Sequence, residues 1–121
     1  MFIILVKLDH FLFKSRGYKA VFLNRIDGQF ADHHGCRLGQ WYDTGKGKEI
    51  FGKVPSYSKL DSPHKIVHDR IHSAIRCVET GTCIPEAKNV MTYFKEAETA
   101  SKDVFALLTT LLKEERQKRK E

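Results

Sequence analysis

The 121-residue sequence lacks a hydrophobic stretch long enough to cross a membrane, which takes about 18 consecutive apolar residues. Its apolar opening, residues 2–6, is too short for a signal peptide, with no positive segment before it and no small-residue cleavage site after it. The three cysteines are an odd number, which does not suit a disulfide framework. The length of 121 residues predicts a single domain, residues 1–121. The absences predict a cytoplasmic, reducing compartment and no membrane insertion.

The sequence is basic, but it lacks the features of a nucleic-acid-binding module. Its 21 Lys and Arg exceed its 15 Asp and Glu, which gives a formal net charge of +6. Much of this excess lies in a charged C-terminal tail, residues 113–121, where basic and acidic residues alternate without aromatic residues between them. Basic surfaces that bind single strands usually carry aromatic residues on which bases stack. We therefore expect a solvated helix end and no nucleic-acid partner.

Hydrophobic periodicity predicts a first helix from about Phe2 to Phe22, with two neighbouring apolar stripes. The stripe expected to form the main buried face has three-four spacing and consists of Ile4, Leu8, Phe11, Tyr18 and Phe22. The neighbouring stripe consists of Ile3, Val6, His10, Phe13 and Ala20. His10, in this second stripe, is expected to point toward the interior. The alternative to a metal-ligand role for it is a core histidine that is hydrogen-bonded to a carbonyl.

The second predicted helix is short. Asp32 is expected to cap it, and it continues to about Tyr42, which places Cys36 in its first turn or so. Residues 24–31 are expected to form a loop before this helix, and residues 44–47 are expected to end it. One further short helix is expected over residues 55–60.

Two long helices complete the predicted fold. The third main helix begins where Ser62 caps it and Pro63 takes the first helical position, and it ends at Gly81. The fourth begins near Pro85 and continues past Leu112. Its apolar positions follow a seven-residue repeat, at Val90, Phe94, Ala97, Ser101, Val104, Leu108 and Leu111. The sequence therefore predicts an all-α fold, a four-helix bundle with an additional short helix.

Four residues have the chemistry and spacing for one zinc ion. His64 and His68 are four apart in a predicted helix, so they lie on one face about one turn apart. Cys36 adds a thiolate and His10 a third imidazole, which completes a tetrahedral site that ties the first three main helices together. A complete ligand set leaves no open position for catalysis, and Lys65 stands where a hydrolase of the HExxH type has its Glu. We therefore expect no enzyme activity.

Other residues near these four are candidate contributors. Asp9, directly before the first histidine, is a candidate for orienting a ligand or tuning the thiol, and the alternative is a simply exposed side chain. His33 and His34 stand close to the predicted cysteine ligand and are expected to be polar neighbours rather than substitute ligands. Cys77 and Cys83 lack metal-ligand spacing and are taken as free thiols.

The three blocks that carry the predicted ligands read His10-x-Leu12, Cys36-x-Leu38-Gly39-x-Trp41 and His64-x-x-x-His68. Together they resemble the chemoreceptor zinc-binding (CZB) domain, from about residue 7 to the end of the last helix. The resemblance implies a helical bundle that holds zinc through three His and one Cys. It also implies a regulatory module of bacterial signalling proteins, at the C-terminus of chemoreceptors or attached to diguanylate cyclases. The charged C-terminal end favours the chemoreceptor.

The single cysteine suggests how such a module would respond. A thiolate is the zinc ligand that oxidants attack most readily, through sulfenic acid, whereas imidazole is much more resistant. Cys36 is therefore predicted to be a redox switch, and the resemblance implies the same, with hypochlorous acid among the oxidants and chemotaxis as the output. The resemblance further implies a homodimer. The alternatives are a zinc-concentration sensor and a structural, zinc-stapled dimerisation module of a diguanylate cyclase.

Overall fold

The computed structural model describes residues 2–120, and these form an all-helical bundle without strands. The five helices are α1 (Phe2–Leu23), α2 (Arg37–Asp43), α3 (Lys46–Phe51), α4 (Asp61–Thr80) and α5 (Ala87–Lys120). The predicted all-α fold is therefore confirmed. Within residues 2–120, no helix combines the length and the apolar content that crossing a membrane requires.

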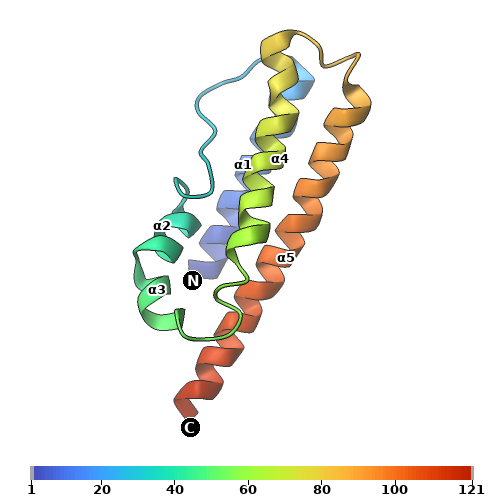
Figure 1. The fold of residues 1–121 in the computed structure, drawn as a ribbon. Coiled ribbons are helices and arrows are strands. Elements are labelled where there is room, and N and C mark those ends of the chain that lie inside the picture. The colour runs from blue at the N-terminus through green and yellow to red at the C-terminus, as the bar shows by residue number, and fades with distance from the viewer. Residues whose placement is uncertain (1, 121) are drawn as a thin grey trace.

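The long helices α1, α4 and α5, of 22, 20 and 34 residues, make the body of the molecule (Figure 1). Helices α4 and α5 form an antiparallel hairpin, and α1 packs behind α4. After α1, an extended segment returns along the side of the hairpin to α2 and α3, which cover the lower end of the bundle. This arrangement brings the middle of α1, the start of α2 and the first half of α4 to the same level.

The long seam of α5 is buried as its seven-residue repeat predicts. All seven predicted positions are buried: Val90, Phe94, Ala97, Ser101, Val104, Leu108 and Leu111. The lower half of this seam packs with Val6, Leu38 and Leu60, and the upper half packs with Phe13 and Ile71. The core therefore runs the length of the hairpin, with α1 along one side of it.

The predicted buried face of α1 is wrong, and the neighbouring stripe is buried in its place. Val6, His10 and Phe13 are at most 8% exposed, whereas Ile4 is 65% and Phe22 88% exposed. The error has a simple cause. Successive residues of a helix are rotated by about 100°, so the two stripes that the sequence placed beside each other face largely different directions on α1, and both are apolar. Periodicity alone does not say which of two apolar faces meets the core.

The predicted start of the second helix at Asp32 is wrong, because that residue caps a separate turn. Its carboxylate accepts hydrogen bonds from the backbone amides of His34 and Gly35, at 3.0 and 2.9 Å. Short acidic side chains commonly stabilise such turns in competition with a helix. Helix α2 therefore begins only at Arg37, and Cys36 is its N-cap residue with an extended backbone, ψ 168°.

The short helix predicted over residues 55–60 is also wrong. Those residues form turns, and the short helix α3 instead occupies residues 46–51. Helix α3 buries Phe51, whose ring lies 5.5 Å from that of Trp41. In the turns that follow, Tyr57 stacks on Tyr42 at 4.3 Å and donates its hydroxyl hydrogen to the Tyr42 carbonyl. Aromatic contacts with α2 therefore decide the local structure here.

Helix α4 begins slightly earlier than predicted. The carbonyl of the buried Leu60 already accepts a hydrogen bond from the His64 amide, at 3.2 Å. Ser62 is thus inside the first turn and is not the cap, and Pro63 lies in that turn, where its missing N–H is tolerated. The predicted end at Gly81 is confirmed, with Gly81 in the left-handed region at φ 69°.

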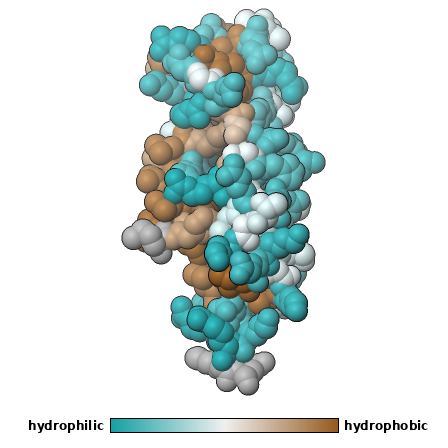
Figure 2. Space-filling model, turned by 90° about the vertical axis from the view of Figure 1, so that its left-hand side faces the viewer, coloured by the Kyte–Doolittle hydropathy of each residue, from teal (hydrophilic) through white to brown (hydrophobic). Residues whose placement is uncertain are grey.

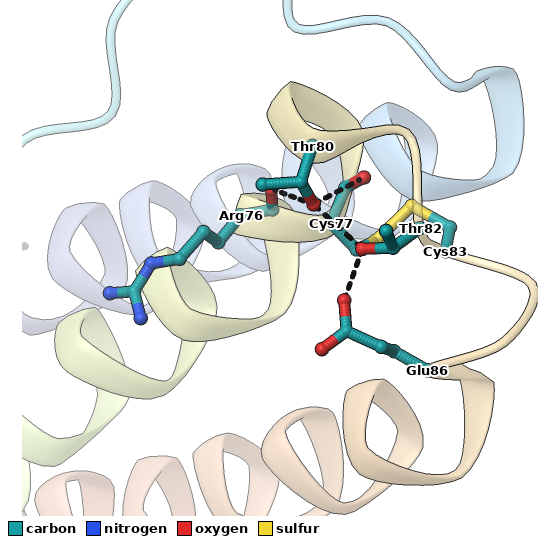
Figure 3. Close-up of a disulfide and its surroundings, with 6 residues drawn as sticks. All are labelled: Arg76, Cys77, Thr80, Thr82, Cys83 and Glu86. Carbon is teal, nitrogen blue, oxygen red and sulfur yellow. Dashed lines mark hydrogen bonds between the residues drawn. A yellow bond between two sulfur atoms is a disulfide. The ribbon is translucent and has the colours of Figure 1, made fainter.

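The prediction that Cys77 and Cys83 are free thiols is wrong, because their sulfur atoms are bonded to each other (Figure 3). The turn that ends α4 brings the two Cα atoms to 4.7 Å, which is within the range of disulfides. Among the described residues, Cys36 is the free cysteine.

Candidate metal centre

The structure brings the four predicted zinc ligands together in one cluster. His10 comes from the middle of α1, Cys36 from the N-cap of α2, and His64 and His68 from the first half of α4. One ligand atom from each lies within 4.8 Å of the others. The three histidines are at most 2% exposed, and the cysteine is partly buried. Residues far apart in the sequence thus meet at one small site with little exposure to solvent.

Unpartnered nitrogen atoms show that the cluster fits a cation. Both ring nitrogens of His10 and Nε2 of His68 are buried without a hydrogen-bond partner. A buried polar atom without a partner is costly and rare in a native structure. Zinc takes imidazole nitrogen and thiolate sulfur in four-coordinate sites, so one ion would satisfy these orphaned atoms.

A backbone carbonyl orients one of these imidazoles. The Ala31 carbonyl oxygen lies 2.9 Å from Nδ1 of His68 and 3.0 Å from Nε2 of His72. A carbonyl only accepts, so Nδ1 of His68 carries the hydrogen and its Nε2 lone pair faces the cluster. Such outer hydrogen bonds fix the tautomer and the ring orientation of metal-binding histidines. No side chain marks this carbonyl in the sequence, so sequence reasoning missed it.

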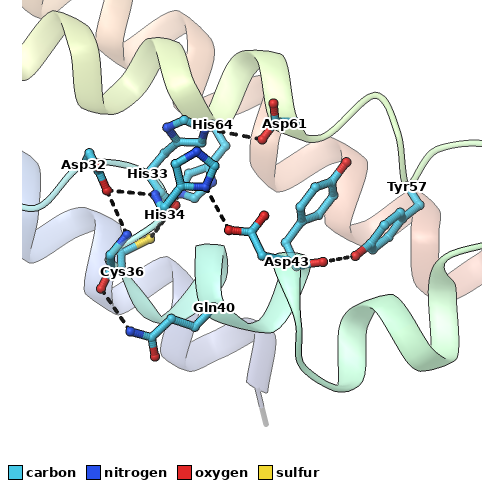
Figure 4. Close-up of polar contacts among 11 residues, drawn as sticks. Asp32, His33, His34, Cys36, Gln40, Asp43, Tyr57, Asp61 and His64 are labelled. Carbon is cyan, nitrogen blue, oxygen red and sulfur yellow. Dashed lines mark hydrogen bonds and ion pairs between the residues drawn. The ribbon is translucent and has the colours of Figure 1, made fainter.

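The thiol of Cys36 faces the histidine pair of α4. Its Sγ lies 3.2 Å from Nε2 of His64 (Figure 4). Gly39, in the first turn of α2, allows the preceding segment to pack this closely, because a Cβ there would overlap the His33 carbonyl oxygen. Burial raises the pKa of the Cys36 thiol, and the nearby backbone amides of Gly39 and Leu38 oppose that rise. A cation beside the sulfur would favour the thiolate.

Burial keeps the clustered histidines neutral. It lowers the pKa of His10 to about 3, with further contributions from His68 and Lys14. It also lowers the pKa of His64 to about 2, and the pKa of His68 falls for the same main reason. Metal binding requires neutral imidazole. The cluster therefore offers its ring nitrogens over the whole physiological pH range.

The two histidines beside the cysteine have other partners, as expected of polar neighbours. Nε2 of His33 lies 3.3 Å from the Asp61 carboxylate. Nδ1 of His34 lies 2.8 Å from the Asp43 carboxylate, a contact that raises the pKa of the exposed His34 (Figure 4). These pairs tie the turn before α2 to α2 itself and to the first turn of α4.

Asp9 lies beside the cluster. Its carboxylate is 3.1 Å from Nε of Arg37, the residue after the cysteine. An open cleft of about 440 Å³ runs past this ion pair and is lined by Cys36, His10 and His68 among others. The ion pair thus stands where a small molecule would approach the sulfur atom. The orienting role that the sequence suggested for Asp9 stays a prediction.

Comparison with known proteins agrees with the geometry. The family model of the chemoreceptor zinc-binding domain matches residues 10–75, which begin at the first residue of the cluster and include the other three. No curated protein and no solved structure matches the chain.

Proposed function

Since the chain belongs to the chemoreceptor zinc-binding domain family, whose members are regulatory zinc-binding domains, we propose that it senses oxidants through Cys36. The observation that supports this proposal is the mixed ligand set. One cysteine among three buried histidines gives the cluster a single readily oxidised ligand. The residues that would hold zinc are His10, Cys36, His64 and His68, and zinc would supply the charge that keeps the sulfur ionised.

The proposed reaction takes place at the Cys36 sulfur, with hypochlorous acid as the oxidant. The thiolate attacks the chlorine atom, an S–Cl bond forms as the O–Cl bond breaks, and hydroxide leaves. Water then replaces chloride on the sulfur, which gives the sulfenic acid. Sulfur loses two electrons and chlorine gains them. A sulfenic acid is a much weaker ligand than a thiolate, so His10, His64 and His68 would be left as an incomplete set.

The place of Cys36 in the fold suggests how this change reaches the rest of the domain. Cys36 joins the extended segment 24–36 to α2, and it faces His64 of α4. Release of its sulfur would free the start of α2 to move against α1 and α4. An attached signalling domain of a chemoreceptor would then read this change in the bundle.

We predict that stoichiometric hypochlorous acid lowers the zinc content of the wild-type domain and oxidises Cys36. The readouts are released zinc, measured with a chromogenic chelator, and oxidation of the tryptic peptide 26–37, measured by mass spectrometry. Cys36→Ala should release no further zinc under the same treatment. Zinc that stays bound while Cys36 is oxidised would overturn the switch. In that case the site would be a zinc-concentration sensor or the structural staple of a dimerisation module, such as that of a diguanylate cyclase.

The exposed stripe of α1 supports a second proposal, a homodimer. Ile4, Leu8, Phe11 and Phe22 are 65, 50, 61 and 88% exposed and lie on one side of the helix. Figure 2 shows hydrophobic side chains gathered along the edge of the molecule where α1 lies. Contiguous apolar surface on a small domain usually marks an interaction site. A symmetric pair would cover the same stripe on both copies.

We predict that Leu8→Glu, combined with Phe11→Glu, converts the dimer into a monomer in sedimentation velocity at micromolar concentrations. Each change places a charge in the stripe, and the buried face of α1 is unchanged. Thr109→Glu, on the exposed side of α5, is the matched control and should leave the mass unaltered. A monomeric wild type, or a double variant that still dimerises, would contradict the α1 interface.

A further inference from the structure

A second pair of sulfur atoms lies at the turn between α4 and α5, away from the metal centre. Cys77 is in the last turn of α4, and Cys83 follows six residues later (Figure 3). Cys77 lies nine positions after His68 in the sequence, which corresponds to about 14 Å along α4. Nothing in the zinc chemistry of the domain requires this pair.

The backbone holds the two cysteines together without help from the S–S bond. Gly81 is in the left-handed conformation at φ 69°. The amide of Thr82 donates to the Cys77 carbonyl at 2.9 Å, and the Gly81 amide donates to the Val78 carbonyl at 3.4 Å. These two bonds form a Schellman cap, which turns the chain back over the end of its helix. Cys83 follows this cap directly, so its place beside Cys77 is set by backbone hydrogen bonds.

Side-chain hydrogen bonds also stabilise this turn. The hydroxyl groups of Thr80 and Thr82 lie 2.6 Å apart, and Thr82 donates to the Glu86 carboxylate (Figure 3). The Glu86 amide in turn donates to the Thr82 carbonyl at 3.0 Å. These contacts involve no sulfur. They would therefore keep two reduced thiols adjacent, and reduction would not open the turn.

The two sulfur atoms differ in their access to solvent. Cys77 is 3% exposed, whereas Cys83 is only partly buried. A small oxidant therefore meets Cys83 first, and the buried Cys77 is positioned as the resolving thiol.

We propose that Cys77 and Cys83 form a second redox site, a reversible dithiol–disulfide couple that reacts with small two-electron oxidants such as hypochlorous acid. The Cys83 thiolate attacks chlorine, which forms an S–Cl bond and releases hydroxide. The Cys77 sulfur then attacks the Cys83 sulfur, so that the S–S bond forms, chloride leaves, and the Cys77 proton passes to water. Two thiols and one hypochlorous acid thus give one disulfide, one chloride, one proton and one water. Exchange with two molecules of a thiol reductant such as glutathione restores the two cysteine thiols, and the reductant leaves as its own disulfide.

The two redox sites then differ in what oxidation does. Oxidation of Cys36 removes a ligand, whereas oxidation of the pair at the turn adds a covalent link between α4 and the segment that leads into α5. Because backbone and threonine contacts already set the turn, the link locks an existing arrangement and does not create a new one. The pair needs no zinc, so its reaction is independent of the metal centre.

Tryptic peptides separate the two sites in one experiment. Residues 26–37 contain Cys36, and residues 77–88 contain both Cys77 and Cys83. The reduced, zinc-loaded chain is treated with limiting hypochlorous acid, alkylated and digested. We expect peptide 77–88 to lose two hydrogens and both alkylation sites, and glutathione to restore them. Cys36→Ala should leave this result unchanged, and Cys83→Ser should abolish it.

Three other outcomes would overturn the proposal. These are sulfinic or sulfonic acids in peptide 77–88 without the internal disulfide, disulfides between chains, and a pair that stays reduced while Cys36 is fully oxidised.

Gly81→Ala tests the role of the backbone. A non-glycine residue is disfavoured in the left-handed region, and only the dithiol form of this variant is free to relax that strain. The variant should therefore shift the glutathione equilibrium toward the dithiol by up to about tenfold. An unchanged equilibrium would contradict preorganisation by the cap. None of these outcomes bears on zinc release at Cys36.

Discussion

Replacing His68 with alanine is expected to lower the affinity for zinc by more than about 100-fold. Changes to groups that merely orient a ligand cost about 10- to 100-fold, and loss of a ligand should cost more. The change also removes an imidazole whose Nε2 is buried without another partner. Zinc competition with a chromophoric chelator measures the affinity. Because the ion binds the folded chain, zinc at about 1,000 times its dissociation constant stabilises the wild type by about 4 kcal/mol, and the variant should lose most of that stabilisation.

His72→Ala is the matched control for this prediction. His72 lies one turn further along α4 and bonds the same Ala31 carbonyl, but it is not part of the cluster. We expect this variant to bind zinc within about tenfold of the wild type, as for the loss of a partial orienting contact. Equal losses in the two variants would mean that the fourfold ligand set is wrong.

The metal-free domain is expected to lose stability steeply as the pH falls below about 6.5. Burial lowers the pKa of His10 to about 3 and that of His64 to about 2 in the folded chain, while both have ordinary values near 6.5 when unfolded. Between these limits the unfolded chain binds more protons, so acid favours unfolding and stability rises with pH. Each histidine contributes up to about 1.4 kcal/mol per pH unit, or about 3 kcal/mol per unit for the two.

Urea denaturation of the chelator-treated chain at pH 7.5, 6 and 5 measures this slope. His10→Gln should reduce it by about a third to a half, because glutamine does not titrate while the buried His64 and His68 still do. The control is His34→Gln: the exposed His34 has a raised pKa beside Asp43 and does not contribute to acid destabilisation. If His10→Gln leaves the slope unchanged, the histidine is not buried in its neutral form.

The sequence predicted best where a pattern was long or chemically distinctive. The repeat of α5 specifies one buried seam over seven positions, and all seven are buried. The family and the zinc chemistry followed from the spacing of three short blocks, and the structure brings His10, Cys36, His64 and His68 together. A metal site of this kind depends on a few side chains whose types and intervals are visible in the chain.

The sequence did not decide between two local structures where both were compatible with the same residues. Both sides of α1 are apolar, so the buried side is decided by which neighbours α1 meets. Asp32 suits a helix cap and an isolated turn equally, and the turn prevails because it accepts two amides there. The pairing of Cys77 with Cys83 depends on the chain reversal at Gly81, which places their Cα atoms 4.7 Å apart. The Ala31 carbonyl carries no side-chain signal at all.

The distribution of the ligands over the helices also implies an order of assembly. Helices α4 and α5 are joined by a short turn, so their contacts close a small loop, which is fast and costs little entropy. Two imidazoles, His64 and His68, are already on one face of that hairpin. The other ligands require α1 and the segment before α2 to return over long chain distances. A partly folded chain with only the hairpin formed can therefore hold zinc weakly by two histidines. The coordination shell is completed when α1 brings His10 and the start of α2 brings Cys36.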